Sequence, residues 1–142
     1  MNTATTLAAP LATANNPQPK AAPVPKVGDG ATVYYWSDVE SHTVIRVSKS
    51  GQTAWIQRDK TTLLNGCNSG EPDALTFTPG GFVGHTSGVQ RYAISPDPEG
   101  EILRISLRKK GKFAGTWRTA GNNSGAARVR IGIRDEHYDF NF

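Results

Sequence analysis

The sequence predicts an all-β fold, either a small SH3-like barrel or a β-sandwich with about 6–8 short antiparallel strands. Two observations lead to this expectation. No segment keeps the 3.6-residue spacing of an amphipathic helix, whereas several short runs alternate apolar and polar residues with period two. In addition, 15 glycines and 9 prolines divide the chain into short pieces, as turns between strands require.

The N-terminal segment, residues 1–26, differs from the rest. It is mostly Ala, Thr, Pro and Asn, with Lys20, Lys26 and no acid. It has no charged start followed by an apolar run, so it does not resemble a signal peptide. No part of the chain has the ~20 consecutive apolar residues of a membrane span. We expect a flexible Ala/Pro-rich arm before a single all-β domain, residues 27–142, and no membrane association. Alternatively, the arm orders on a partner or a neighbouring subunit.

The first half of the domain is expected to hold three strands, at Ala31–Trp36, His42–Ser48 and Thr53–Arg58. A Gly-Asp-Gly turn precedes the first, and Gly51 can supply the positive φ of a tight turn between the second and third. Period-two alternation in the second strand would place Thr43, Ile45 and Val47 on one face.

Residues 64–90 interrupt the strand pattern. They contain two prolines and six glycines around a few apolar residues, and connections longer than about 12–15 residues are uncommon unless they bind something or are disordered. We interpret them as an inserted Gly/Pro-rich loop. Cys67, the single cysteine, lies in this loop; it excludes an intrachain disulfide and is compatible with a reducing cytoplasm.

The second half of the domain is expected to hold a short strand at Arg91–Ile94, a hairpin of Glu101–Arg108 with Lys112–Arg118, and a last strand at Ala127–Arg134. A Pro- and Asp-containing turn at 96–100 precedes the hairpin. In the returning strand of the hairpin, Phe113 and Trp117 are expected to face inward, on the side opposite the charges.

Basic residues concentrate in this second half. Between Ile102 and Arg134 nine side chains are basic and none is acidic. In the first hairpin strand and in the last strand, basic and apolar residues alternate, so the apolar ones can face the core while the basic ones face outward together. The resulting predicted set, which we call the cationic face, is Arg104, Arg108, Lys112, Arg118, Arg128, Arg130 and Arg134.

An acid-free face of this kind predicts an anionic partner, because a surface that served only solubility would mix both signs of charge. Arginine predominates, and its planar guanidinium matches phosphate bidentately. We therefore expect a phosphate-bearing ligand, a nucleotide or nucleic acid, with Trp36 and Trp55 as possible aromatic contacts. The alternative is that the protein's own acids, at 97–101 or at 135–139, fold over the face and neutralise it.

No chemistry is predicted. The three histidines are scattered, and ligand spacings such as His-x₃-His are missing. The acidic cluster at 135–139 could act as a general acid and base only beside a nucleophile or a metal, and the sequence places neither there. Helix-turn-helix, zinc-finger and basic-helix patterns are absent too. We expect no catalytic residue, no metal and no cofactor, and a non-enzymatic binding protein.

Several segments resemble a family of small uncharacterised proteins encoded by bacteriophages and prophages. They are Val27–Val33, Trp36–Asp38, Gln57–Lys60, Ser106–Phe113 and Ile131–Glu136, and the likeness covers about residues 27–142. The resemblance implies a phage origin and expression in the host bacterial cytoplasm, and it assigns no role to any residue. It suggests that sequestering a nucleotide could counter host defence. Two alternatives are a virion accessory protein anchored by the N-terminal arm, and an inhibitor that docks on an acidic host protein. A homo-oligomer is expected.

Overall fold

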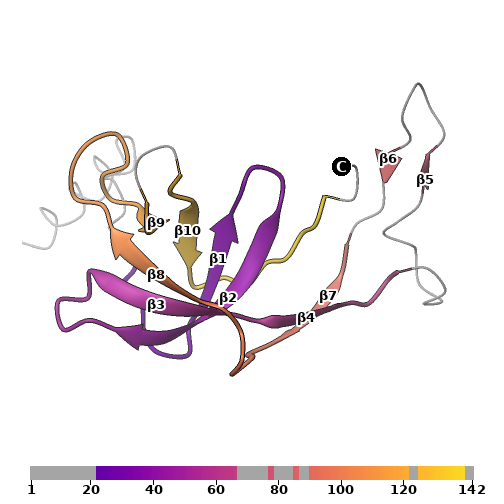
Figure 1. The fold of residues 1–142 in the computed structure, drawn as a ribbon, viewed down its shortest axis with the longest axis horizontal. Coiled ribbons are helices and arrows are strands. Elements are labelled where there is room, and N and C mark those ends of the chain that lie inside the picture. Colours follow the sequence, from indigo (N-terminus) through magenta and orange to yellow (C-terminus); the bar gives the residue numbers. More distant parts are fainter. Residues whose placement is uncertain (1–21, 67–76, 79–84, 87–89, 122–124, 140–142) are drawn as a thin grey trace, which may run out of the picture.

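The computed structural model of the protein describes residues 22–66, 77–78, 85–86, 90–121 and 125–139. Six strands form a closed, wholly antiparallel barrel, in the cyclic order β1-β10-β9-β8-β3-β2 (Figure 1). Their bounds are Gly30–Tyr34 (β1), Val39–Val47 (β2), Thr53–Arg58 (β3), Ile102–Leu107 (β8), Trp117–Thr119 (β9) and Arg128–Ile131 (β10). The all-β prediction is confirmed, and the barrel alternative is the one that the protein adopts.

The barrel interior collects the apolar half of each alternating strand. The first and last strands close the barrel, with Ala31 opposite Ile131 and Val33 opposite Val129. Inward residues of the other strands complete one buried cluster: Val44, Ala54, Ile56, Ile105 and Trp117. Because side chains alternate across a strand, the residues between these core positions face outward, and this places the arginines of β8, β9 and β10 on the outer surface.

A two-stranded ribbon continues from the barrel, formed by β4 (Lys60–Leu63) and β7 (Tyr92–Ser95). Farther along it lies the short pair β5 (Phe77–Thr78) and β6 (His85–Thr86) (Figure 1). The return path from β7 to β8 includes the predicted turn at 96–100. Gly100 is required there, since a Cβ would lie 2.1 Å from the carbonyl oxygen of Arg58. The inserted loop was expected at 64–90, and most of it, with Cys67, lies outside the described residues.

Two segments outside the barrel strands are fixed against them. Pro25 is buried, and Ala22 packs on the core, while the indole N–H of Trp117 donates to the Pro23 carbonyl at 3.2 Å. Residues 22–26, which we had assigned to the arm, therefore lie against the barrel; residues 1–21 are outside the part that the structure describes. After β10, residues 133–139 cross the outside of β1 and β2, where Val39 and His137 form a β-bridge.

Three strand predictions need correction. In β2, a bulge between Val44 and Arg46 shifts the register, so Val44 and Val47 pair with inward Ile56 and Ala54 while Ile45 is the extra residue. The predicted strand 112–118 is mostly a turn, which the Gly115 N–H closes on the Arg108 carbonyl at 2.7 Å. Here the alternating pattern indicated a strand wrongly, because both glycines of the turn, 111 and 115, adopt positive φ.

The third correction concerns the last strand. It was expected to continue to Arg134, but β10 ends at Ile131. Gly132 has a φ of 94° and donates its N–H to the Gly30 carbonyl at 2.8 Å, which turns the chain out of the strand. Among the described residues, no helix has the length and apolar character needed to cross a membrane.

Candidate anion-binding face

Strand register places two arginines directly opposite one another. Arg118 of β9 pairs with Arg128 of β10, and Arg128 pairs in turn with Tyr34 of β1. All three alternate with core residues, so they share the outer surface. Like charges at directly opposed positions destabilise a sheet, and this pair is therefore a feature that folding alone does not favour.

Arg118 is held in place by neutral groups. The Cζ atom of its guanidinium lies 3.6 Å from the ring centroid of Phe113, and one of its nitrogens donates to the Ala126 carbonyl at 3.2 Å. The Nζ atom of Lys112 lies over the same ring, 5.4 Å from its centroid. Phe113 was expected to face inward. It lies outside because residues 111–116 form a turn, and it brings Lys112 and Arg118 together.

Arg128 is exposed, and its Cζ atom lies 5.9 Å from the ring centroid of Tyr34. In the described part of the chain, neither Arg128 nor Arg118 forms an ion pair with a carboxylate. Phe113 and Tyr34 lie against the guanidinium groups through cation–π contacts, which leave the positive charge uncompensated.

The two arginines line a shallow pocket of about 340 Å³ together with three aromatic residues. Tyr34 ends β1, and Tyr35 and Trp36 follow in the loop to β2, which the Tyr35 N–H closes on the Asp38 carbonyl at 2.9 Å. Trp36 is 98% exposed. Burial, and secondarily the charge of Glu40, raise the pKa of Tyr35 above its usual 10.0, so this phenol is neutral at physiological pH. We call this hollow the aromatic pocket.

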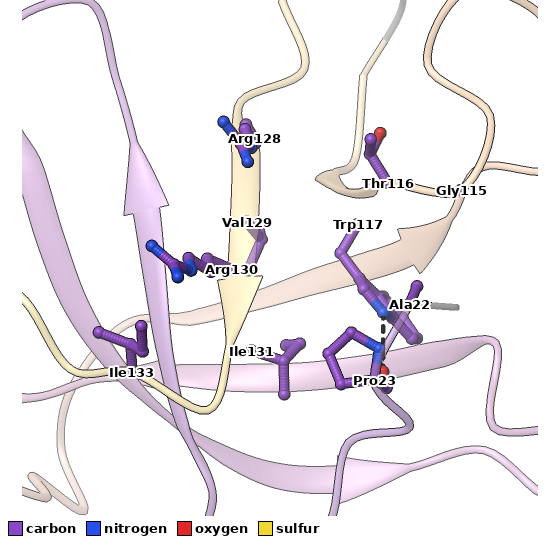
Figure 2. Close-up of a pocket in the computed structure, with 10 residues that line it drawn as sticks. All are labelled: Ala22, Pro23, Gly115, Thr116, Trp117, Arg128, Val129, Arg130, Ile131 and Ile133. Carbon is purple, nitrogen blue, oxygen red and sulfur yellow. Dashed lines mark hydrogen bonds between the residues drawn. The ribbon is translucent and has the colours of Figure 1, made fainter. Parts of the chain in front are cut away.

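A second hollow of about 500 Å³ lies beside it, lined by Trp117, Val129, Ile131 and the N-terminal residues Ala22 and Pro23. Figure 2 shows Val129 and Ile131 on the side of β10 that faces Trp117, whereas Arg130 and Ile133 extend the other way. Arg128 lines both hollows. The cationic position at Arg128 is thus flanked by an apolar hollow and by the aromatic pocket.

Other members of the cationic face lie farther from Arg128. Arg130 is exposed two residues along the same strand. Arg108 donates to the carbonyls of Thr119 and Gly121, at 3.1 and 3.2 Å. Arg104, on β8, is exposed and stands opposite Trp55 of β3. The Trp55 ring is already covered by Arg46, whose Cζ lies 4.5 Å from the ring centroid.

Arg134 does not belong to the face. Its Nε lies 3.4 Å from a carboxylate oxygen of Asp59, and another of its nitrogens donates to the Thr43 hydroxyl at 3.0 Å. Asp59 is buried, and it also accepts hydrogen bonds from Ser41 and Thr43, at 2.6 and 2.5 Å. The turn at Gly132 carries Arg134 away from the outward row of β10, which the uninterrupted alternation in the sequence did not reveal.

Glu136, one of the acids that could have neutralised the face, is paired elsewhere. Glu136 accepts two hydrogen bonds from Arg58, at 2.9 and 2.6 Å, and one from the Ser41 N–H at 2.9 Å. Burial opposes the charge of Arg58, but the hydrogen bonds and charge of Glu136 outweigh it and raise the pKa of Arg58. We call this group the paired cluster: Ser41, Thr43, Arg58, Asp59, Arg134 and Glu136.

Sequence reasoning found Trp36, Arg118 and Arg128, which the aromatic pocket brings together, and it missed Phe113 and Tyr35. The glycines at 111 and 115, spaced as in a turn, were the available signal for Phe113. Within the described ranges there is no group of three or more His, Cys, Asp or Glu side chains that could hold a metal ion. Comparisons of the chain with protein-family models, with curated proteins and with solved structures gave no match.

Proposed function

We propose that this is a non-enzymatic binding protein that engages a phosphate-bearing anionic ligand, a nucleotide or a nucleic-acid backbone, through Arg118 and Arg128. The observation that supports it is the pair of arginines at directly opposed strand positions, neither of which has a carboxylate partner in the described residues. An anion placed between them would convert an unfavourable like-charge contact into charge-assisted hydrogen bonds. Lys112 and Arg130 would add charge at the two sides of the pair.

Phosphate suits this arrangement better than a protein carboxylate does. A guanidinium is a planar fork of donors that can match two phosphate oxygens. Arg128 can offer this fork, and Arg118 adds the donors that it does not use for Thr116 and Ala126. The neighbouring aromatic rings can contact a base or a sugar. The phage origin, the host cytoplasm as compartment, a counter-defence role and homo-oligomerisation stay predictions, because they derive from the resemblance and from composition.

The test uses phosphates without bases. A fluorescent abasic deoxyribose-phosphate oligomer of about 12 units is titrated by fluorescence anisotropy at several salt concentrations. The double variant Arg118→Gln/Arg128→Gln should bind at least about tenfold more weakly, and the slope of log K against log salt should become shallower by about 1.4, or 0.7 for each lost phosphate contact.

The matched control is Lys49→Gln/Lys60→Gln, which removes the same charge from exposed positions on the β2–β3 turn and on β4. It should keep most of the affinity. Equal losses in the two double variants would mean that only net charge matters, and absence of binding by the unmodified protein at low salt would refute the proposal.

A further inference from the structure

We infer that the ligand is a single-stranded nucleic acid, with a base stacked on Trp36 and the adjoining phosphates on Arg128 and Arg118; this inference rests on the proposed function. It assigns the aromatic pocket as a base-stacking site, which specifies the kind of phosphate compound that the face binds.

The first support is the position of Trp36. A nearly fully exposed indole is unusual for the largest apolar side chain, which on average is highly buried. The loop that presents it is closed by a backbone hydrogen bond between Tyr35 and Asp38, and it follows directly from barrel strand β1. A flat π-surface is therefore offered to solvent from a constrained position, as base stacking requires.

The second support is what surrounds Trp36. The same shallow pocket is lined by both arginines of the opposed pair and by Tyr34. Proteins that bind single strands combine cationic groups that follow the backbone with aromatic rings that stack on successive bases. The aromatic pocket holds both kinds of group within one hollow, whereas either kind alone would be an ordinary surface feature.

The open shape of the pocket favours a strand over a mononucleotide. Pockets for small ligands bury about 70–90% of the ligand surface, but an indole that is 98% exposed can cover only one face of a base. Affinity must then come from several phosphates, and positive charge continues beyond the pocket at Lys112 and Arg130. A duplex fits less well, because its bases are already stacked and paired.

Trp55 offers a natural control. It too lies on the outer surface of the barrel, beside the cationic residue Arg104. However, Arg46 already lies over its ring, and Trp55 is only partly exposed, whereas Trp36 is almost fully exposed. Substitution of either tryptophan removes the same side chain, and only Trp36 should matter for binding.

The experiment compares two fluorescent probes of equal length and charge at low salt: a thymidine oligomer and its abasic counterpart. The unmodified protein should bind the thymidine oligomer about tenfold more tightly, the effect expected of one stacked base. Trp36→Ala should abolish that preference and leave affinity for the abasic oligomer unchanged. Trp55→Ala should keep the preference. Thermal unfolding of both variants checks that the barrel is intact.

Equal affinity of the unmodified protein for both probes would overturn the stacking inference, while binding of the abasic probe would still uphold the proposed function. Loss of the preference in Trp55→Ala as well would also overturn it, since the effect would not be specific to the aromatic pocket. A duplex of equal length that bound as tightly as the thymidine strand would overturn the single-strand assignment. If neither probe bound, the proposed function itself would fail.

Discussion

The arginines on two sides of the barrel differ in whether they pair with carboxylates. Around β2 and β3, Arg58 and Arg134 are paired with Glu136 and Asp59. On β9 and β10, Arg118 and Arg128 face each other without a carboxylate among the described residues. The carboxylates of the first side are brought by distant parts of the chain, one at the end of β3 and one in the segment after β10. Pairing therefore depends on the path of residues 133–139, the described part of the segment after β10, which cross β1 and β2 and carry Glu136 to Arg58.

The first prediction concerns the carboxylate of Asp59, at the centre of the paired cluster, whose removal should cost the most stability. Asp59→Ala should destabilise the protein by about 3 kcal/mol, because it leaves a charge and two buried hydroxyls without their partner. Chemical denaturation measures this loss. Glu99→Ala, at an exposed turn position, should change stability by no more than about 0.5 kcal/mol. A small effect for Asp59→Ala would mean that the cluster is not held by this carboxylate.

A second prediction concerns pH. His42 of β2 is 1% exposed, and burial lowers its pKa below the usual 6.5, with Arg58 nearby also lowering it. In the unfolded chain, His42 therefore takes up a proton as the pH falls through 6.5. In the folded protein, His42 stays neutral until the pH reaches its own, lower pKa. The contribution of neutral His42 to the free energy of unfolding is therefore fully present above pH 6.5 and declines below it.

Thermal unfolding between about pH 7.5 and pH 5.5 should show this decline, and His42→Gln should flatten it. A melting temperature that fell equally in the variant would assign the pH dependence to other groups.

The third prediction concerns Arg128, whose substitution should change stability the least. Arg128→Gln should change the free energy of unfolding by no more than about 0.5 kcal/mol, because the residue is exposed and its removal relieves repulsion with Arg118. Denaturant titration of this variant beside the unmodified protein provides the measurement. A loss above about 1.5 kcal/mol would show that Arg128 stabilises the fold, so the opposed arginines would no longer indicate a ligand site.

Much of the barrel could be predicted from the sequence. β3 has the predicted bounds Thr53–Arg58, because nothing interrupts its alternation and a turn precedes it. Alternation also placed Arg118 and Arg128 on the outer surface. What it could not reveal were the points where a single residue changes the register. The bulge at Ile45 has no sequence signature, and the turn at 111–116 keeps the alternating order of residues that a strand would have.

The candidate site depended on the same limits. In the sequence, Arg134 continues the alternation of basic residues in β10. In the structure, the chain turns at Gly132, and the Arg134 guanidinium pairs with Asp59. Phe113 was expected to face inward from a strand, whereas it lies in a turn and contacts Arg118 on the outer surface. Period-two patterns assign faces only within a strand, so they cannot say which distant carboxylate a side chain will meet.

The closure of the barrel has a consequence for how the chain is made. Strand β1 needs β10 as its neighbour, and residue 31 pairs with residue 131. During synthesis, β1 therefore keeps one edge open until β10, about 100 residues later in the chain, has also been made. Because folding slows when contacts join residues that are distant in sequence, closure of the barrel is expected to be a late step of folding.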